Sequence, residues 1–140
     1  MLFVILSTGC AGSPSSKPKA ANQEVPALQN QTVHFDFGKK SVRDNDFDIL
    51  KAVALHLQQE KKAVAILEGH ADPSGSAIYN EILAEDRARA VRVYLRDQGA
   101  DPARTTVVSK GSREPAVKGA SQAALAADRR VEIILTLLRD

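Results

Sequence analysis

Asp72 and Arg87 are an acid and a base whose spacing could serve recognition of a zwitterionic ligand. Asp72 follows a short apolar run, and Arg87 lies further on, in a stretch with helical periodicity. If that helix packs back on the preceding strand, both side chains can face one cleft. A carboxylate accepts hydrogen bonds from an ammonium, whereas a planar guanidinium donates two parallel bonds to a carboxylate. A structural salt bridge between the two fits the same spacing, so both interpretations stay open.

Two His-x-Asp pairs, His34/Asp36 and His70/Asp72, are the alternative candidates for chemistry. Alternate side chains of an extended strand share a face, so each pair would place an imidazole beside a carboxylate. Together they could supply four nitrogen and oxygen ligands to a metal in a metal-dependent enzyme. Local hydrogen bonding of His70 at a strand end explains the pattern as well. We expect no metal at these positions.

The composition excludes several other functions. The 140 residues contain 19 Lys and Arg against 17 Asp and Glu, which is too balanced for a dedicated nucleic-acid-binding protein. A single Cys excludes an internal disulfide and any zinc site built from cysteine pairs. No Gly-x-Ser-x-Gly elbow is present, so a serine hydrolase of that type is not expected. We expect neither an enzyme nor a bound cofactor.

The elements that would position Asp72 and Arg87 can be predicted from periodicity. Alternating or continuous apolar runs bounded by Gly or Pro indicate strands, and apolar residues three and four apart indicate helices. The resulting order is strand 33–37, helix 47–57, strand 63–67, helix 77–98, strand 105–109, helix 122–127 and strand 130–138. This β-α-β-α-β-(α)-β order predicts an α/β (α+β) domain over residues 31–140, with one sheet and its helices on one face.

The N-terminal residues have a different character. Residues 1–9 are apolar and then small, and they lead directly to the only cysteine, Cys10. Residues 11–30 are rich in Ser, Pro, Lys and Ala, which predicts a flexible linker. The small residues directly before Cys10, behind a Val-Ile-Leu run, resemble a bacterial lipobox. This resemblance implies that residues 1–9 are a truncated lipoprotein signal peptide and that residues 10–30 are a lipidated cysteine with its tether. The alternative is an N-terminal strand with a buried, free Cys10.

Several motifs in the body of the chain occur in a fixed order with characteristic gaps. They are Phe35-Asp-Phe37, Gly69-His-Ala-Asp72, Tyr79-Asn80, Arg87-Ala88 and Asp128-Arg-Arg130-Val-Glu132. This ordered set resembles the OmpA-like peptidoglycan-binding domain, the family that includes the C-terminal domain of OmpA, MotB and the Pal lipoproteins. The resemblance extends from about residue 33 to residue 138. It implies a mixed four-stranded sheet with helices packed on one face.

The resemblance also implies a ligand. It implies noncovalent binding of the peptidoglycan stem peptide through its diaminopimelate residue. Asp72 would accept from the diaminopimelate ammonium and Arg87 would bind its carboxylate, with Asn80 supporting the same cleft. On this basis we expect Asp72→Ala and Arg87→Ala to remove most wall binding and to leave the fold intact.

Three further ligand-binding residues follow from the same resemblance. Arg130 would lie at the rim of the cleft, and Phe35 and Asp36 would contribute to its floor. The sequence departs from the family pattern at Asp128, where Asn is more common. The extra negative charge of Asp128 is expected to pair with Arg130.

A lipidated cysteine, a tether and a single domain resemble the architecture of the Pal branch of this family. This implies a lipoprotein anchored by its acyl chains in the outer membrane of a Gram-negative bacterium, on the periplasmic face. It would tether that membrane to the cell wall. The alternative is a protein–protein adaptor in a Tol-Pal-type envelope complex, with Tol-system proteins as partners and wall binding secondary.

Overall fold

Four strands and three α-helices alternate along residues 28–139, the part of the chain that the computed structural model describes. The strands are β1 (Gln31–His34), β2 (Ala63–Gly69), β3 (Thr105–Ser109) and β4 (Arg130–Leu137), and the helices are α1 (Phe47–Gln59), α2 (Ala77–Asp97) and α3 (Gln122–Asp128). The predicted signal peptide, Cys10 and nearly all of the predicted linker lie outside the described residues.

The strands form one mixed sheet in the order β1-β4-β2-β3. β4 is antiparallel to both β1 and β2, and β2 is parallel to β3. Parallel neighbours need a crossover, and α2 provides it between β2 and β3. The predicted α/β fold with a mixed four-stranded sheet is therefore confirmed.

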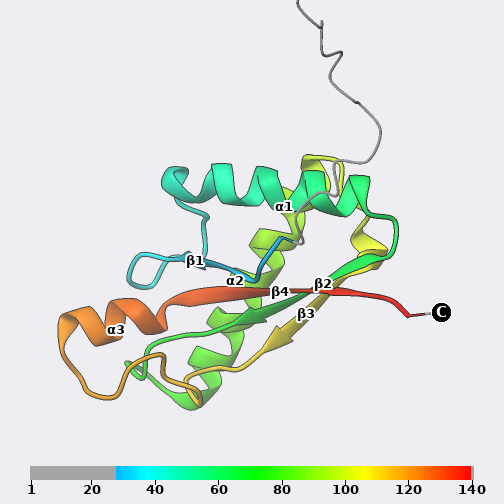
Figure 1. Ribbon diagram of the computed structural model, residues 1–140. Helices are drawn as coiled ribbons and strands as arrows, with labels where there is room; N and C mark the ends of the chain where they lie inside the picture. The colour runs from blue at the N-terminus through cyan, green and yellow to red at the C-terminus, as the bar shows by residue number, and fades with distance from the viewer. Residues whose placement is uncertain (1–27, 140) are drawn as a thin grey trace, which may run out of the picture.

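One face of this sheet forms the core. β2 buries every second residue, and the buried side chains meet α1 and α2. The core residues of the sheet are Val33, Ala63, Ala65, Leu67, Val131 and Ile133, and those of the two helices are Leu50, Val53, Ala54, Leu57, Ala88, Val91 and Leu95. α3 lies beyond the end of the sheet, beside the start of β4 (Figure 1). None of the described helices is long and apolar enough to cross a membrane.

Helix α2 begins and ends at residues whose chemistry explains its limits. The Ser76 hydroxyl accepts a hydrogen bond from the backbone N–H of Tyr79, so it caps the first turn. Gly99, just beyond the helix, has a φ of 100°, a conformation that residues with a side chain rarely adopt. The predicted end of the helix at Gly99 is confirmed.

The first strand differs from its prediction. The alternation of apolar residues predicted a strand over 33–37, but β1 ends at His34. Phe35 is still buried, and its N–H donates to the Arg129 carbonyl (2.8 Å), whereas Phe37 is 69% exposed. The chain leaves the sheet after Phe35 and turns at Gly38, where φ is 64°. Phe37 therefore belongs to a loop and not to the core.

Close contact between β2 and α2 depends on Gly69. A Cβ atom at this position would lie 1.8 Å from the Ala84 carbonyl oxygen, which belongs to the helix backbone and cannot rotate away. We expect Gly69→Ala to lower the free energy of unfolding by about 3 kcal/mol, measured by urea denaturation. Gly38→Ala is the matched control, because a Cβ there meets no atom of residues 28–139 within 4 Å. Its positive φ should cost about 1 kcal/mol, and equal losses in both variants would contradict the proposed contact.

Candidate functional site

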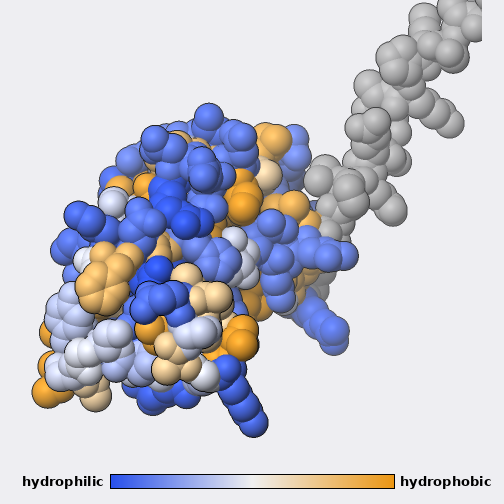
Figure 2. Space-filling view, turned by 90° about the vertical axis from the view of Figure 1, so that its left-hand side faces the viewer, coloured by the Kyte–Doolittle hydropathy of each residue, from blue (hydrophilic) through white to orange (hydrophobic). Residues whose placement is uncertain are grey.

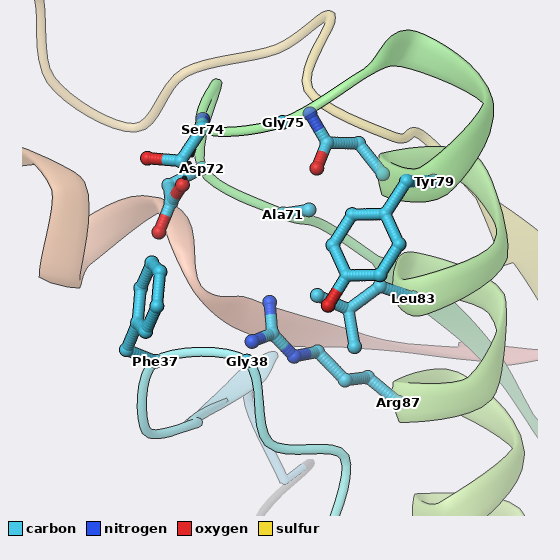
Figure 3. Close-up of a pocket in the computed structure, with 10 residues that line it drawn as sticks. Phe37, Gly38, Ala71, Asp72, Ser74, Gly75, Tyr79, Leu83 and Arg87 are labelled. Atoms are coloured by element: carbon cyan, nitrogen blue, oxygen red, sulfur yellow. Dashed lines mark hydrogen bonds between the residues drawn. The ribbon is translucent and has the colours of Figure 1, made fainter.

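A pocket lies where β2 ends and the chain turns into α2. Its walls come from the turn after β2, the first turns of α2 and the loop after β1, and it encloses about 120 Å³. The lining residues are Phe37, Gly38, Ala71, Asp72, Ser74, Gly75, Tyr79, Asn80, Leu83 and Arg87. Asp72 and Arg87 lie on opposite sides of the cavity, with Phe37 and Tyr79 at its flanks (Figure 3).

Asp72 is a nearly buried carboxylate with two partners. Its Oδ1 accepts from the backbone N–H of Ser74 (2.9 Å), which closes a local turn and orients the side chain. Its Oδ2 accepts from Nη1 of Arg129 (3.4 Å). A carboxylate has about four lone-pair sites. Asp72 therefore keeps acceptor capacity for a ligand in the pocket.

Arg87 is completely buried and is held by three backbone carbonyls. Its Nε donates to Lys39 (2.8 Å), Nη1 to His70 (3.0 Å) and Nη2 to Asp36 (3.2 Å). A guanidinium has five N–H groups. One N–H on each terminal nitrogen consequently has no acceptor among residues 28–139. These two groups can donate as a pair to a carboxylate in the pocket.

The guanidinium keeps its charge in this buried position. Burial lowers the pKa of Arg87 to about 10, and the negative charge of Asp72 opposes that shift. The side chain is thus cationic at neutral pH. The guanidinium carbon of Arg87, Cζ, also lies 5.3 Å from the centre of the Phe35 ring, within the range of a cation–π contact.

Asp72 and Arg87 face one pocket but do not pair with each other. Within the described residues the ion-pair partner of Asp72 is Arg129, at 3.4 Å. The salt-bridge interpretation of the Asp72 and Arg87 spacing is therefore wrong. The cleft interpretation predicted the observed arrangement, in which one fixed anion and one fixed cation flank a cavity.

Asn80 lies in the wall of the pocket, as predicted, and is almost completely buried. Its Nδ2 donates to the Ser112 hydroxyl (3.4 Å), in the loop between β3 and α3. The same loop is attached to the end of β2 because the Ala71 N–H donates to the Gly111 carbonyl (2.8 Å). Asn80 therefore joins α2 to the loop that borders the pocket.

Phe35 and Asp36 lie beneath the pocket and do not line it. Phe35 is buried under the guanidinium of Arg87, and the backbone carbonyl of Asp36 accepts from that guanidinium. The Asp36 carboxylate points elsewhere, with Nη1 of Arg43 at 4.0 Å. Phe35 and Asp36 were predicted to contribute to the floor of the cleft. They do so indirectly, because they hold Arg87 in place and do not themselves reach the cavity.

The prediction that Arg130 lies at the rim is wrong, because its neighbour Arg129 reaches the site. Arg130 is the first residue of β4, and its side chain shares the outer face of the sheet with Glu132, whose Oε1 accepts from its Nε (2.9 Å). Arg129 precedes the strand and points the other way, to Asp72. The Asp128 carboxylate accepts from the Ala116 N–H (2.8 Å), so the expected pairing of that carboxylate with Arg130 is also not seen.

The two His-x-Asp pairs do not form a metal site. β1 ends at His34 and β2 at Gly69, so the period of two no longer applies at Asp36 and Asp72. Asp72 turns into the pocket, whereas the nearest carboxylate to the His70 ring nitrogens in an ion pair is that of Glu132.

Phe37 and Tyr79 are pocket residues whose role the sequence did not predict. Both are aromatic and largely exposed, and their rings flank the cavity. The prediction of a strand over 33–37 assigned the Phe37 ring to the core, so its place in the pocket was not predicted. Figure 2 shows that apolar residues on the α3 side of the molecule form small groups surrounded by hydrophilic ones.

The burial of Arg87 changes the expected effect of its substitution. Arg87→Ala was predicted to leave the fold intact, but it would leave three buried carbonyls without their donor. We now expect even Arg87→Lys to lower the free energy of unfolding by at least about 2 kcal/mol, because an ammonium cannot reach all three acceptors.

Urea denaturation measures this loss. The matched control is Arg89→Lys, on the same helix, where the arginine is exposed and paired with Glu85. That variant should change stability by less than about 0.5 kcal/mol. If the Arg87→Lys protein were as stable as the control, the three hydrogen bonds of Arg87 would not stabilise the fold as we expect.

Comparison with known proteins identifies relatives. The OmpA family matches residues 34–129. The chain is 36% identical to outer membrane porin F of Pseudomonas aeruginosa over 88% of this chain and 37% of that protein. It is 37% identical to the peptidoglycan-associated lipoprotein of Haemophilus influenzae over 71% of this chain and 65% of the relative. The chain thus spans less than two thirds of the length of either protein.

A solved structure shares the fold. The crystal structure of the peptidoglycan-associated lipoprotein from Burkholderia pseudomallei superimposes with a TM-score of 0.74 at 31% identity. The superposition covers 76% of this chain and 90% of that structure.

Proposed function

The chain belongs to the OmpA family, and on this basis we propose that its folded part binds the diaminopimelate of the peptidoglycan stem peptide in the Asp72 and Arg87 pocket. OmpA-family domains are non-enzymatic peptidoglycan binders. Binding is noncovalent, so no bond of the wall is made or broken.

The observation that carries this proposal is the placement of one buried anion and one buried cation on opposite sides of a single cavity. The free end of diaminopimelate bears an ammonium and a carboxylate on one carbon atom. Asp72 accepts from the ammonium with its remaining lone pairs. Arg87 donates to the carboxylate with the N–H groups that its three carbonyl partners leave over.

Preorganisation supports this function. The guanidinium of Arg87 is fixed by backbone atoms from two segments, and Asp72 is oriented by the turn at Ser74. The ligand therefore meets charges whose ordering was completed during folding, which lowers the entropic cost of binding. The ligand ammonium competes with Arg129 for Asp72, or shares the carboxylate with it.

We extend the proposal to the whole chain from its N-terminal sequence. Acyl chains on Cys10 would anchor the protein in the outer membrane, and residues 11–30 would give the domain its reach. A fully extended segment of that length spans up to roughly 70 Å. The name of the Haemophilus influenzae relative, a peptidoglycan-associated lipoprotein, supports this role as a periplasmic tether between membrane and wall.

Co-sedimentation with purified diaminopimelate-type peptidoglycan tests the pocket. We expect Asp72→Asn, which removes the charge and keeps the shape, to weaken binding at least tenfold, because the ligand ammonium is left without a counter-charge. Asp97→Asn is the matched control, since Asp97 is an exposed carboxylate at the far end of α2. Unchanged pelleting of a folded Asp72→Asn protein would refute the site.

The chemistry of the wall provides a second test. Peptidoglycan with lysine in place of diaminopimelate keeps the ammonium and lacks the carboxylate that Arg87 would bind. We expect wild-type protein to pellet at least tenfold less well with lysine-type wall. Equal pelleting with both walls would refute the role of Arg87. If neither wall pellets the folded protein, a Tol-type protein partner becomes the function to test.

A further inference from the structure

The face of the sheet opposite the core carries a cluster of charged side chains near the end of β2. Glu68 of β2 is directly opposite Glu132 of β4 in the register of the sheet. Two carboxylates in that relation repel each other, so the face attracts positive charge. Arg130 pairs with Glu132 at 2.9 Å. Glu68 is left with the more distant ammonium of Lys110, at 3.9 Å.

His70 lies within this cluster and is only 1% exposed. Among residues 28–139, neither of its ring nitrogens has a hydrogen-bond partner. The nearest carboxylate oxygen in an ion pair, Oε2 of Glu132, is 3.9 Å from Nε2, beyond hydrogen-bond distance. A buried polar group without a partner is rare in folded proteins. Burial, and then the positive charge of Arg130, lower the pKa of His70. A neutral imidazole has one nitrogen whose lone pair can bind a metal.

Two carboxylates lie next to this imidazole. One ligand atom each from Glu68, His70 and Glu114 lies within 4.8 Å of the other two. The ammonium of Lys110 is beside both acids, 3.4 Å from Glu114 and 3.9 Å from Glu68. A cationic group of the protein thus lies where the three side chains converge.

We propose that Glu68, His70 and Glu114 form a binding site for a divalent transition-metal cation, and that Zn²⁺ is the ion that fits it. Imidazole nitrogen and carboxylate oxygen both bind zinc, and a site with three protein ligands keeps water in the fourth position. The imidazole favours zinc over Mg²⁺ or Ca²⁺, which prefer oxygen ligands alone. Zinc displaces the ammonium of Lys110 from the two acids.

The geometry allows the ligands to close on the ion. Ligand atoms around zinc lie about 2.0–2.2 Å from the metal, so they must approach one another more closely than they do here. Glu114 is in the loop between β3 and α3, and its side chain is 55% exposed, which leaves it free to swing toward His70. Zinc would then attach this loop to β2. The same loop borders the peptidoglycan pocket through Ser112.

Isothermal titration of the full chain with ZnCl₂ at about pH 7.5 tests the site. The protein is prepared without a histidine tag, with Cys10→Ser to remove the thiol, and is stripped with chelator beforehand. We expect saturable one-to-one binding with a Kd below about 10 µM. His70→Leu and Glu114→Gln should each weaken binding at least tenfold, since each removes one of three ligands.

Lys110→Met distinguishes a metal site from a merely structural cluster. Removing the competing ammonium should tighten zinc binding several-fold, an effect that loss of an ordinary salt bridge would not produce. The matched control is His56→Leu, because His56 is another buried histidine with an unpartnered Nδ1, but lies on α1 outside this cluster. Its zinc affinity should equal that of the parent protein.

Each outcome decides the proposal. Absence of saturable binding below about 100 µM overturns it, as does binding that Glu114→Gln and Lys110→Met leave unchanged. If circular dichroism shows that His70→Leu does not fold, Glu114→Gln decides, because this exposed loop residue can be changed without disturbing the core. The test does not depend on wall binding, so either proposal can fail without the other.

Discussion

The hydrogen bonds from the buried guanidinium of Arg87 to three backbone carbonyls are the interaction on which the rest of the structure depends. They join α2 to the loop after β1, through Asp36 and Lys39, and to the end of β2, through His70. The three carbonyls that accept these bonds come from two segments that are far apart in the sequence, and none of the three belongs to a regular strand or helix. The guanidinium therefore replaces the backbone pairing that the chain loses where it leaves the sheet.

The same residue meets two requirements that normally conflict. A buried charge is costly unless it is paired and hydrogen-bonded, and Arg87 meets this condition largely with neutral carbonyls and a ring face from Phe35. Because no carboxylate in the described part of the chain pairs with it directly, its positive charge remains available to an anionic ligand. Asp72 supplies the opposite charge across the cavity and is oriented by its own turn. Stability and recognition thus share one set of contacts.

His70 connects two environments on opposite sides of the backbone. Its carbonyl accepts from Arg87 on the pocket side, and its imidazole lies among Glu68, Glu132, Arg130 and Lys110 on the outer face of the sheet. The loop that carries Glu114 borders both regions, since Ser112 contacts Asn80. A change in the conformation of that loop would therefore affect both the pocket and the outer face of the sheet.

Periodicity along the sequence was enough to predict the order of the strands and helices along the chain and the end of α2 at Gly99. These features depend on the spacing of residues close together in the chain, which can be read directly from the sequence. The spacing of Asp72 and Arg87 allowed a cleft or a salt bridge, and the resemblance to the OmpA-like family favoured the cleft. Only the tertiary structure decided that Arg129 and not Arg130 reaches Asp72, that Phe37 belongs to the pocket, and that Arg87 supports the fold. Each of these three features depends on where a strand ends and on which backbone atoms then lack a hydrogen-bond partner. Packing between segments that are remote in sequence decides both.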